Sequence, residues 1–303
     1  MQTETITLDK QEFTLYIQYQ SEENLRKEFN QLTNETWGFD FENYYKSGYW
    51  DDNCMIYSLF HDNHIVAHTT VSTFDTITKN EHLVLAQLGT VMTHPDYKNR
   101  GLSRYLMERI KEDYKDKING MFLFANDSVL DFYPKFNFLP VQEFQASKQI
   151  EFRESSHQVT KLNLDNLDQR KLLETYVDNS ISTSSFNTKN RSLTFFYCYA
   201  YPDFGFKDSV YYIESLKTIA IAQCDENVLT ILQLYQLEEQ NIEDIISALA
   251  TAEIDTVLFG FSPVNTDFNY DIYKEEDLTL FVSPELEDIF NNQRLMIPVL
   301  SHT

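Results

Sequence analysis

The stretch that decides the fold is TVMTHPDYKNRGLSRYLMERIK, residues 90–111. An apolar segment precedes Gly101, and Leu102 and Leu106 follow it at helical spacing. Residues 97–111 hold five basic residues and one acid, where an even spread of the chain's 24 Lys and Arg would place about one basic residue. A cationic turn that opens a helix directly after a strand suits a phosphate group, because backbone N–H groups and the helix dipole both favour negative charge there. The stretch therefore predicts a site for a phosphorylated ligand.

The segments around this turn predict a sheet with a crossover helix. Gly89 interrupts one of the apolar runs, which predicts a bulge or a place where another group approaches the backbone closely. A helix that begins at Ser21 is expected in the segment before these strands. A short helix is expected to begin at Ser128 and to stop near Tyr133, before Pro134. The remaining pattern indicates strands at 55–60, 64–74, 83–93, 121–125 and 138–144, with a helix at 102–114.

The second half repeats this order weakly. A hairpin is expected over 218–223 and 228–236, followed by a helix at 242–250 and a strand at 256–261. An internal duplication is therefore conceivable. The segment before its helix, 237–241, is acidic and lacks glycine, so coenzyme A is not expected to bind in this half.

Two motifs resemble the GNAT superfamily of acyl-CoA N-acyltransferases. Residues 98–103, KNRGLS, resemble the [QR]-x-x-G-x-[GA] loop that holds the pyrophosphate of coenzyme A, and the preceding THPDY resembles the V-x-P-x-Y lead-in. Residues 125–138, ANDSVLDFYPKFNF, resemble the N-x-x-x-x-x-F-Y-x-x-x-G-F segment. Lys98, Ser103 and Asn137 depart from these patterns but keep positive charge, small size and tolerance of left-handed backbone, respectively.

The resemblance covers roughly residues 55–140 and implies an α/β (α+β) fold of the GNAT type. In such a fold a mixed, mostly antiparallel twisted sheet is flanked by helices. The order of the halves is similar to that of the larger Eis-like members, without their third domain. The expected domains are therefore a GNAT acetyltransferase domain at 1–150 and a degenerate GNAT-like domain at 151–303.

The resemblance also implies a chemistry: transfer of an acetyl group from acetyl-CoA to a primary amine by direct attack in a ternary complex, with no metal. Tyr133 would give a proton to the thiolate; a packed aromatic is the alternative. Asn126 would contact the cofactor arm or a bridging water; a helix cap is the alternative. The other residues that the resemblance assigns to the cofactor are Val91, Met92, Thr93, Lys98, Asn99, Arg100, Gly101, Leu102, Ser103 and Arg104.

The sequence leaves the general base open. Glu35, Asp75, Glu81 and Gln87 are polar candidates that position alone cannot rank. Eis-like enzymes are thought to use a terminal carboxylate, which here would belong to Thr303; the missing third domain argues against this choice.

Aromatic residues between positions 37 and 50 are candidates to wall an acceptor pocket. Cation–π attraction there would suit a polyamine or an aminoglycoside-like amine, and ordinary core is the alternative. His61, His64 and His68 fit a strand face better than a metal site. The aromatic candidates are Trp37, Phe39, Phe41, Tyr44, Tyr45, Tyr49 and Trp50.

The composition and charge of the chain limit the classes of partner that it is expected to bind. The chain is 42% hydrophobic and 15% aromatic, which indicates a globular protein, and its formal charge of −23 disfavours nucleic acid and anionic membranes. Three cysteines without a C-x-x-C pair and the lack of a leader or membrane-spanning run predict a cytoplasmic location. We expect a small-molecule or peptide amine as acceptor and leave a homodimer open. A catalytically silent acyl-CoA-binding sensor and a mononucleotide-binding domain are the alternatives.

Overall fold

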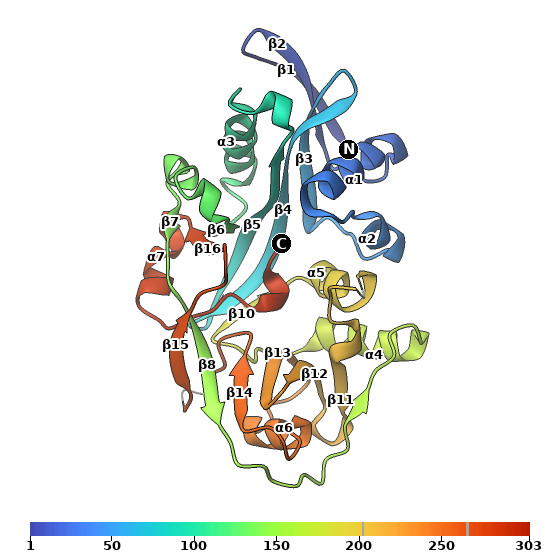
Figure 1. Ribbon diagram of the computed structural model, residues 1–303, viewed down its shortest axis with the longest axis vertical. Coiled ribbons are helices and arrows are strands. Elements are labelled where there is room, and N and C mark those ends of the chain that lie inside the picture. Colours follow the sequence, from blue (N-terminus) through green and yellow to red (C-terminus); the bar gives the residue numbers. More distant parts are fainter. Residues whose placement is uncertain (202, 265–266) are drawn as a thin grey trace.

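Two mixed β-sheets, covered by helices, form the computed structural model, which describes residues 1–201, 203–264 and 267–303 (Figure 1). Within these residues the first sheet has nine strands in the order β1-β2-β3-β4-β5-β6-β16-β7, with β10 paired to the end of β4. Their bounds are β1 (Gln2–Leu8), β2 (Gln11–Ile17), β3 (Cys54–His61), β4 (His64–Thr78), β5 (Glu81–Thr93), β6 (Gly120–Ala125), β7 (Leu139–Pro140), β10 (Phe186–Lys189) and β16 (Thr279–Val282).

The second sheet has seven strands in the described residues, in the order β15-β8-β14-β13-β12-β11-β9. Its central hairpin and its βαβ unit were expected from the sequence, and the structure confirms both. The bounds are β8 (Glu143–Gln149), β9 (Thr160–Lys161), β11 (Val210–Ile213), β12 (Thr218–Asp225), β13 (Val228–Gln236), β14 (Thr256–Phe259) and β15 (Asn269–Tyr273).

The helices begin and end where the local sequence favours it. Gly101, at φ +80°, precedes α3 in a left-handed conformation that glycine adopts without strain. The side chain of Asn241 accepts a hydrogen bond from the first turn of α6. The bounds are α1 (Glu23–Trp37), α2 (Glu42–Ser47), α3 (Leu102–Tyr114), α4 (Leu167–Asn179), α5 (Arg191–Phe195), α6 (Ile242–Leu249) and α7 (Pro284–Asn291).

A β-bulge interrupts the pairing of β4 with β5. Thr70 lies opposite Gly89, but His68 already lies opposite Met92, so β5 carries one extra residue at this point. Thr90 there has a φ of +44°, which is unusual for a β-branched residue. The bulge that Gly89 predicted is confirmed.

The strands β5 and β6 pair over only part of their length. Helix α3 connects them, and they run parallel from Leu85 beside Gly120 to Leu88 beside Leu123. Beyond Gly89 the pairing ends, so β5 and β6 separate at the bulge.

The two sheets exchange strands reciprocally. In the first sheet β6 is followed by β16, which comes from the end of the chain, and then by β7. In the second sheet β14 is followed by β8, which comes from the first half, and then by β15. The strand orders β4-β5-β6-β16-β7 and β12-β13-β14-β8-β15 therefore correspond, and each is completed by the other half of the chain (Figure 1). The division at residue 150 stays a prediction.

Two expectations about local structure are wrong, and one hairpin was missed. Residues 128–133 form no continuous helix, because the segment is short and Pro134 supplies no backbone N–H; two 3₁₀ turns replace it, Asp127–Val129 and Tyr133–Phe136. The expected strand at 138–144 is split between β7 and β8, which belong to different sheets. The β1–β2 hairpin, with positive φ at Asp9 and Lys10, was not anticipated. No helix in the described parts of the chain is long and apolar enough to cross a membrane.

Candidate active site

A cavity of about 1170 Å³ opens where β5 and β6 separate. Its walls come from both halves of the chain: the β5 bulge, the turn before α3, the 3₁₀ turn at Tyr133–Phe136, the end of α1, the segment after α5 and the last residues of the chain. The sequence-predicted cofactor and catalytic residues therefore converge on one space, with one exception given below.

The bulged part of β5 forms one wall. Val91, Met92 and Thr93 line the cavity together with Gly89 and Thr90. Because β6 does not pair with these residues, their main-chain groups on that side are free to bind a ligand. Val91, Met92 and Thr93 are among the residues that the resemblance assigns to the cofactor, and that role stays a prediction.

The basic turn forms the neighbouring wall. Asn99 and Gly101 have φ values of +62° and +80°, and a Cβ added at Gly101 would contact nothing within 4 Å. Ser103 is tied to Thr93 by a hydroxyl–hydroxyl hydrogen bond of 2.6 Å, which joins the turn to the bulged strand. The predicted turn residues that line the cavity are Lys98, Asn99, Gly101, Leu102, Ser103 and Arg104.

Arg100 is the exception, because it is not among the residues that line the cavity. Its guanidinium donates a hydrogen bond of 2.8 Å to Gln11 and lies 5.0 Å from the ring of Tyr97. The side chain thus anchors the turn to the β1–β2 hairpin. Its assignment to the cofactor stays a prediction.

Tyr133 lines the cavity and is 5% exposed. Its ring packs against Phe281, at 5.9 Å between centroids, and against Phe138, at 6.4 Å. Burial raises the pKa of Tyr133 to about 12. The phenol is therefore protonated at neutral pH, as a proton donor has to be.

Asn126 also lines the cavity, but its side chain is engaged. Its Nδ2 donates to Asp277 Oδ2 at 3.0 Å, and the neighbouring Asp127 N–H donates to Asp277 Oδ1 at 2.7 Å. The cap that the sequence left as an alternative is not formed, since the Asn126 side chain makes no capping hydrogen bond. Its contact with a cofactor stays a prediction.

The polar candidates for a general base differ in burial and in their position relative to the cavity. Glu35, Asp75 and Glu81 are exposed and are not among the residues that line the cavity. Gln87 is fully buried, and its amide, in the orientation that satisfies both groups, donates to the Ser301 carbonyl at 2.5 Å and accepts from the Thr303 N–H at 2.9 Å.

The last residues of the chain therefore lie inside the site. Thr303 lies against Gly89 so closely that a Cβ on that glycine would overlap it. The close approach that Gly89 predicted is thus made by Thr303. The ring of His302 lies 4.0 Å from that of Phe124, and burial lowers the pKa of His302 to about 4.

A buried chain of hydrogen bonds ends at the bulge. The hydroxyl of Tyr19 bonds to Ser58 at 2.6 Å, and Ser58 bonds to Nδ1 of His68 at 2.7 Å. On the other side of the imidazole, Nε2 bonds to Thr70 at 2.8 Å, and Thr70 bonds to Thr90. Burial lowers the pKa of His68 to about 3, so the ring is neutral and both of its nitrogens serve hydroxyl groups.

The aromatic candidates divide into two groups. Trp37, Phe39, Phe41 and Tyr44 line the cavity. Tyr45, Tyr49 and Trp50 are not among its lining residues and pack elsewhere: Tyr45 lies under the Arg26 guanidinium, Tyr49 stacks on Phe195, and Trp50 stacks on Tyr44.

Sequence reasoning missed the contribution of the second half to this cavity. Phe196, Tyr197 and Phe204 line it, as do Glu275 and His302. The aromatic-rich run FFYCYAYPDFGF at 195–206 was a usable signal, because it resembles in composition the stretch at 37–50. A π-helical turn at Phe196–Ala200, a form often found at functional sites, presents its first two residues to the cavity.

Comparison with known proteins identifies the first half. Residues 18–141 match the family described as the acetyltransferase (GNAT) domain. No curated protein sequence matches the chain.

Solved structures of the same fold cover both halves. A probable N-acyltransferase of unknown function from Enterococcus faecalis superposes with a TM-score of 0.57 and 10% identity, over 89% of this chain and 72% of that one. Eis1 from Mycobacterium abscessus gives 0.55 and 10%, over 88% and 72%. A GCN5-related N-acetyltransferase from Anabaena variabilis gives 0.56 and 11%, over 88% and 72%. The resemblance to the GNAT superfamily and the two-lobed, Eis-like layout are confirmed.

Proposed function

We propose that this chain, whose residues 18–141 form a GNAT domain, is an N-acetyltransferase that transfers the acetyl group of acetyl-CoA to a primary amine in a ternary complex. One observation carries the proposal. The unpaired, bulged end of β5, the basic turn that opens α3 and the phenol of Tyr133 all face one cavity.

The turn fits a diphosphate. The first intrahelical bond of α3 runs from the Tyr105 N–H to the Gly101 carbonyl at 3.0 Å, so the N–H groups before Tyr105 are free of that ladder. Lys98 and Arg104 add positive charge, and the open space at Gly101 leaves room for a phosphate against the backbone. Acetyl-CoA bound here would supply the thioester whose acetyl group is transferred.

The remaining chemistry needs hydrogen-bond donors at the developing oxyanion and an acid for the leaving thiolate. The main chain at Val91 and Met92 is the candidate for the first role, since β6 leaves it unpaired. Tyr133 is the candidate for the second, because it holds its proton at neutral pH in the same cavity. The second lobe supplies acceptor contacts from Phe196, Tyr197 and Glu275.

The first turn of α6 in the second lobe does not suit a phosphate. Glu243 and Asp244 stand in that turn, and the Asn241 side chain already accepts the Glu243 N–H. The proposal therefore includes one cofactor site in the chain. The acidic composition and the three free cysteines are in keeping with a cytoplasmic protein.

The test is release of free thiol from acetyl-CoA in the presence of a panel of primary amines. Wild-type protein should give amine-dependent release, and Tyr133→Phe should reduce kcat by about 10²-fold or more. If the protein binds coenzyme A but releases no thiol with aliphatic, aromatic or peptide amines, the proposed enzyme activity is wrong and an acyl-CoA sensor is the better interpretation.

A further inference from the structure

The acceptor side of the cavity is built mainly of aromatic rings from both halves of the chain. Phe39 and Phe204 face each other at 5.3 Å between ring centroids. Phe196 lies 5.8 Å from Phe41 and 5.1 Å from Tyr44. All five of these side chains line the cavity.

Part of this wall is open to solvent and not closed core. Trp37 is 44% exposed and Phe204 is 48% exposed, although both line the cavity. Large aromatic side chains at the mouth of a site offer flat apolar area to a ligand.

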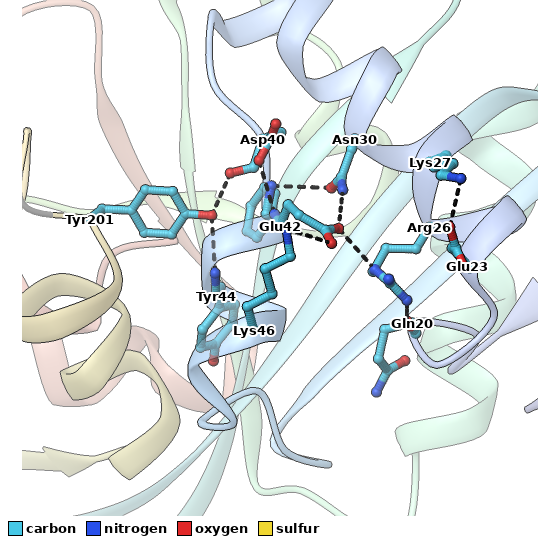
Figure 2. A network of polar contacts seen from close by, with 11 residues as sticks. Gln20, Glu23, Arg26, Lys27, Asn30, Asp40, Glu42, Tyr44, Lys46 and Tyr201 are labelled. Atoms are coloured by element: carbon cyan, nitrogen blue, oxygen red, sulfur yellow. Dashed lines mark hydrogen bonds and ion pairs between the residues drawn. The ribbon is translucent and has the colours of Figure 1, made fainter.

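A network of polar contacts fixes the segment between α1 and α2, which carries part of this wall (Figure 2). The Tyr201 hydroxyl donates to the Asp40 carbonyl and accepts from the Tyr44 N–H, so the second half fixes the segment between α1 and α2. From the other side, Asn30 accepts the Phe41 N–H at 3.1 Å and donates to Glu42 at 3.0 Å.

Arg26 completes this support. Its Nε donates to Glu42 at 3.0 Å, and its Nη1 donates to the Gln20 carbonyl at 2.6 Å. The segment that carries Phe39 and Phe41 is thus preorganised, which lowers the entropy that a ligand would have to remove on binding.

The charges around the cavity do not suit a polycation. Among the described lining residues, Glu275 supplies the single carboxylate side chain, and Lys98, Arg104 and Lys135 supply three cations on the cofactor side. An ammonium group that leaves water without a partner carries a large desolvation cost. A polyamine or an aminoglycoside would bring several such groups for two carboxylates, the Glu275 side chain and the terminal group of Thr303.

We propose that the acceptor is a monoamine whose primary amino group is joined to an aromatic or similarly flat apolar group. The inference rests on the proposed acetyl transfer and deepens it. The aromatic wall binds the apolar group, and the amine faces the bulged end of β5. In the reaction, the amine nitrogen forms a bond to the acetyl carbon, the carbon–sulfur bond breaks and the thiolate takes a proton from Tyr133. The amine nitrogen loses one proton to solvent, and Tyr133 regains one from solvent.

The test compares 2-phenylethylamine with spermidine and kanamycin as acceptors. We expect kcat/KM for 2-phenylethylamine to exceed that for spermidine by at least about tenfold. Phe204→Ala should raise KM for 2-phenylethylamine by about tenfold and leave KM for acetyl-CoA unchanged. Phe204 is half exposed, so its loss should not unfold the protein.

Phe152→Ala is the matched control. Phe152 is 44% exposed and is not among the residues that line the cavity, so its removal should leave every constant at the wild-type value. A preference for spermidine or kanamycin, or equal effects of the two Phe→Ala changes, would overturn the inference.

Calorimetry separates this inference from the proposed function. 2-Phenylethylamine is titrated into the protein saturated with coenzyme A. Binding that Phe204→Ala weakens, without turnover, would leave the pocket assignment standing and remove the enzyme. Turnover of spermidine without binding of 2-phenylethylamine would support the enzyme and refute the pocket assignment. Absence of both binding and turnover of 2-phenylethylamine would also refute the pocket assignment.

Discussion

Thr70 and Thr90 are joined through their hydroxyl groups at the point where β4 and β5 lose register. The bond connects the positive-φ residue of the bulge to His68 and, through it, to Ser58 and Tyr19. The bulge that lines the cavity is thus held by a buried polar chain, and three of its members, Tyr19, Ser58 and His68, are not among the residues that line the cavity.

Thr70→Val is expected to lower the free energy of unfolding by about 1–3 kcal/mol, because it removes the hydroxyl that bonds both Nε2 of His68 and the Thr90 hydroxyl. Urea unfolding measures this loss. Thr76→Val is the matched control: Thr76 is also buried on β4, but its hydroxyl has no partner among the described residues, so its loss should be neutral or stabilising. A larger loss in the control than in Thr70→Val would contradict the role of the chain.

Tyr133→Phe should reduce kcat without changing the affinity for coenzyme A, because the ring is kept and one proton donor is removed. Burial raises the pKa of Tyr133 to about 12, so its deprotonation should not lower the wild-type rate below about that pH. Steady-state kinetics from pH 6 to 10 checks both points. Tyr211→Phe in the second sheet is the control, and a fall in kcat as large as that of Tyr133→Phe would argue against a specific role for the Tyr133 hydroxyl.

Gly101→Glu should weaken coenzyme A binding by at least about tenfold, since it places a negative charge beside the expected phosphates. The free protein should lose only about 1–2 kcal/mol, because the added side chain has open space but the φ of +80° is strained for any non-glycine residue. Isothermal titration calorimetry and urea unfolding measure the two effects.

Gly48→Glu is the control for that change. Gly48 has nearly the same φ, +77°, and the same open space, but it does not line the cavity. It should reproduce the loss of stability and keep the affinity for coenzyme A. Equal losses of affinity in both variants would show that the turn before α3 is not the phosphate site.

Glu143 should make the protein less stable as the pH rises. Burial raises its pKa from the ordinary 4.5 to about 8, against the opposing hydrogen bond from the Ile297 N–H. The native state therefore binds more protons than the unfolded state between these values, so the contribution of Glu143 is full below pH 4.5 and is lost by about pH 8.

Glu143→Gln removes this titration, and its free energy of unfolding should exceed that of the wild type most clearly at pH 8. Urea unfolding at intervals from pH 4.5 to 9 measures the difference. Glu151→Gln, which changes an exposed carboxylate, should follow the wild-type curve. Parallel curves for wild type and Glu143→Gln would contradict the prediction.

The fragment 1–150 should show no cooperative unfolding on its own. It retains β6 but lacks β16, so an apolar sheet edge is left open. Mixing it with the fragment 151–303 should restore a single transition in circular dichroism. A cooperative transition of 1–150 alone would show that the strand exchange is dispensable.

The sequence predicted well what local pattern controls. The strand at 83–93, its irregularity at Gly89 and the helix at 102–114 are all found, because periodicity and glycine placement determine them. The motif residues Gly101 and Tyr133 do meet in one cavity.

What the sequence did not predict depends on pairing between distant segments. The local sequence at 279–282 does not predict that this strand pairs with β6. Likewise, the local sequence at 143–149 does not predict that this strand belongs to the second sheet. The same holds for Thr303, which lies against Gly89 at the end of a segment whose earlier part, α7, contacts β6 and β16. Non-local register is set by the sum of many contacts, which a single sequence does not reveal.

The reciprocal exchange of β8 and β16 also orders events during synthesis. When β6 emerges from the ribosome, its partner has not yet been translated, and the nascent first lobe has to keep that edge protected until the last part of the chain arrives. Domains generally fold as they are synthesised. Here neither lobe can complete its sheet until the strand that the other half supplies has been made. The cavity, whose lining includes Gly89 and Thr303, therefore forms only after β16 and the residues that follow it have been made.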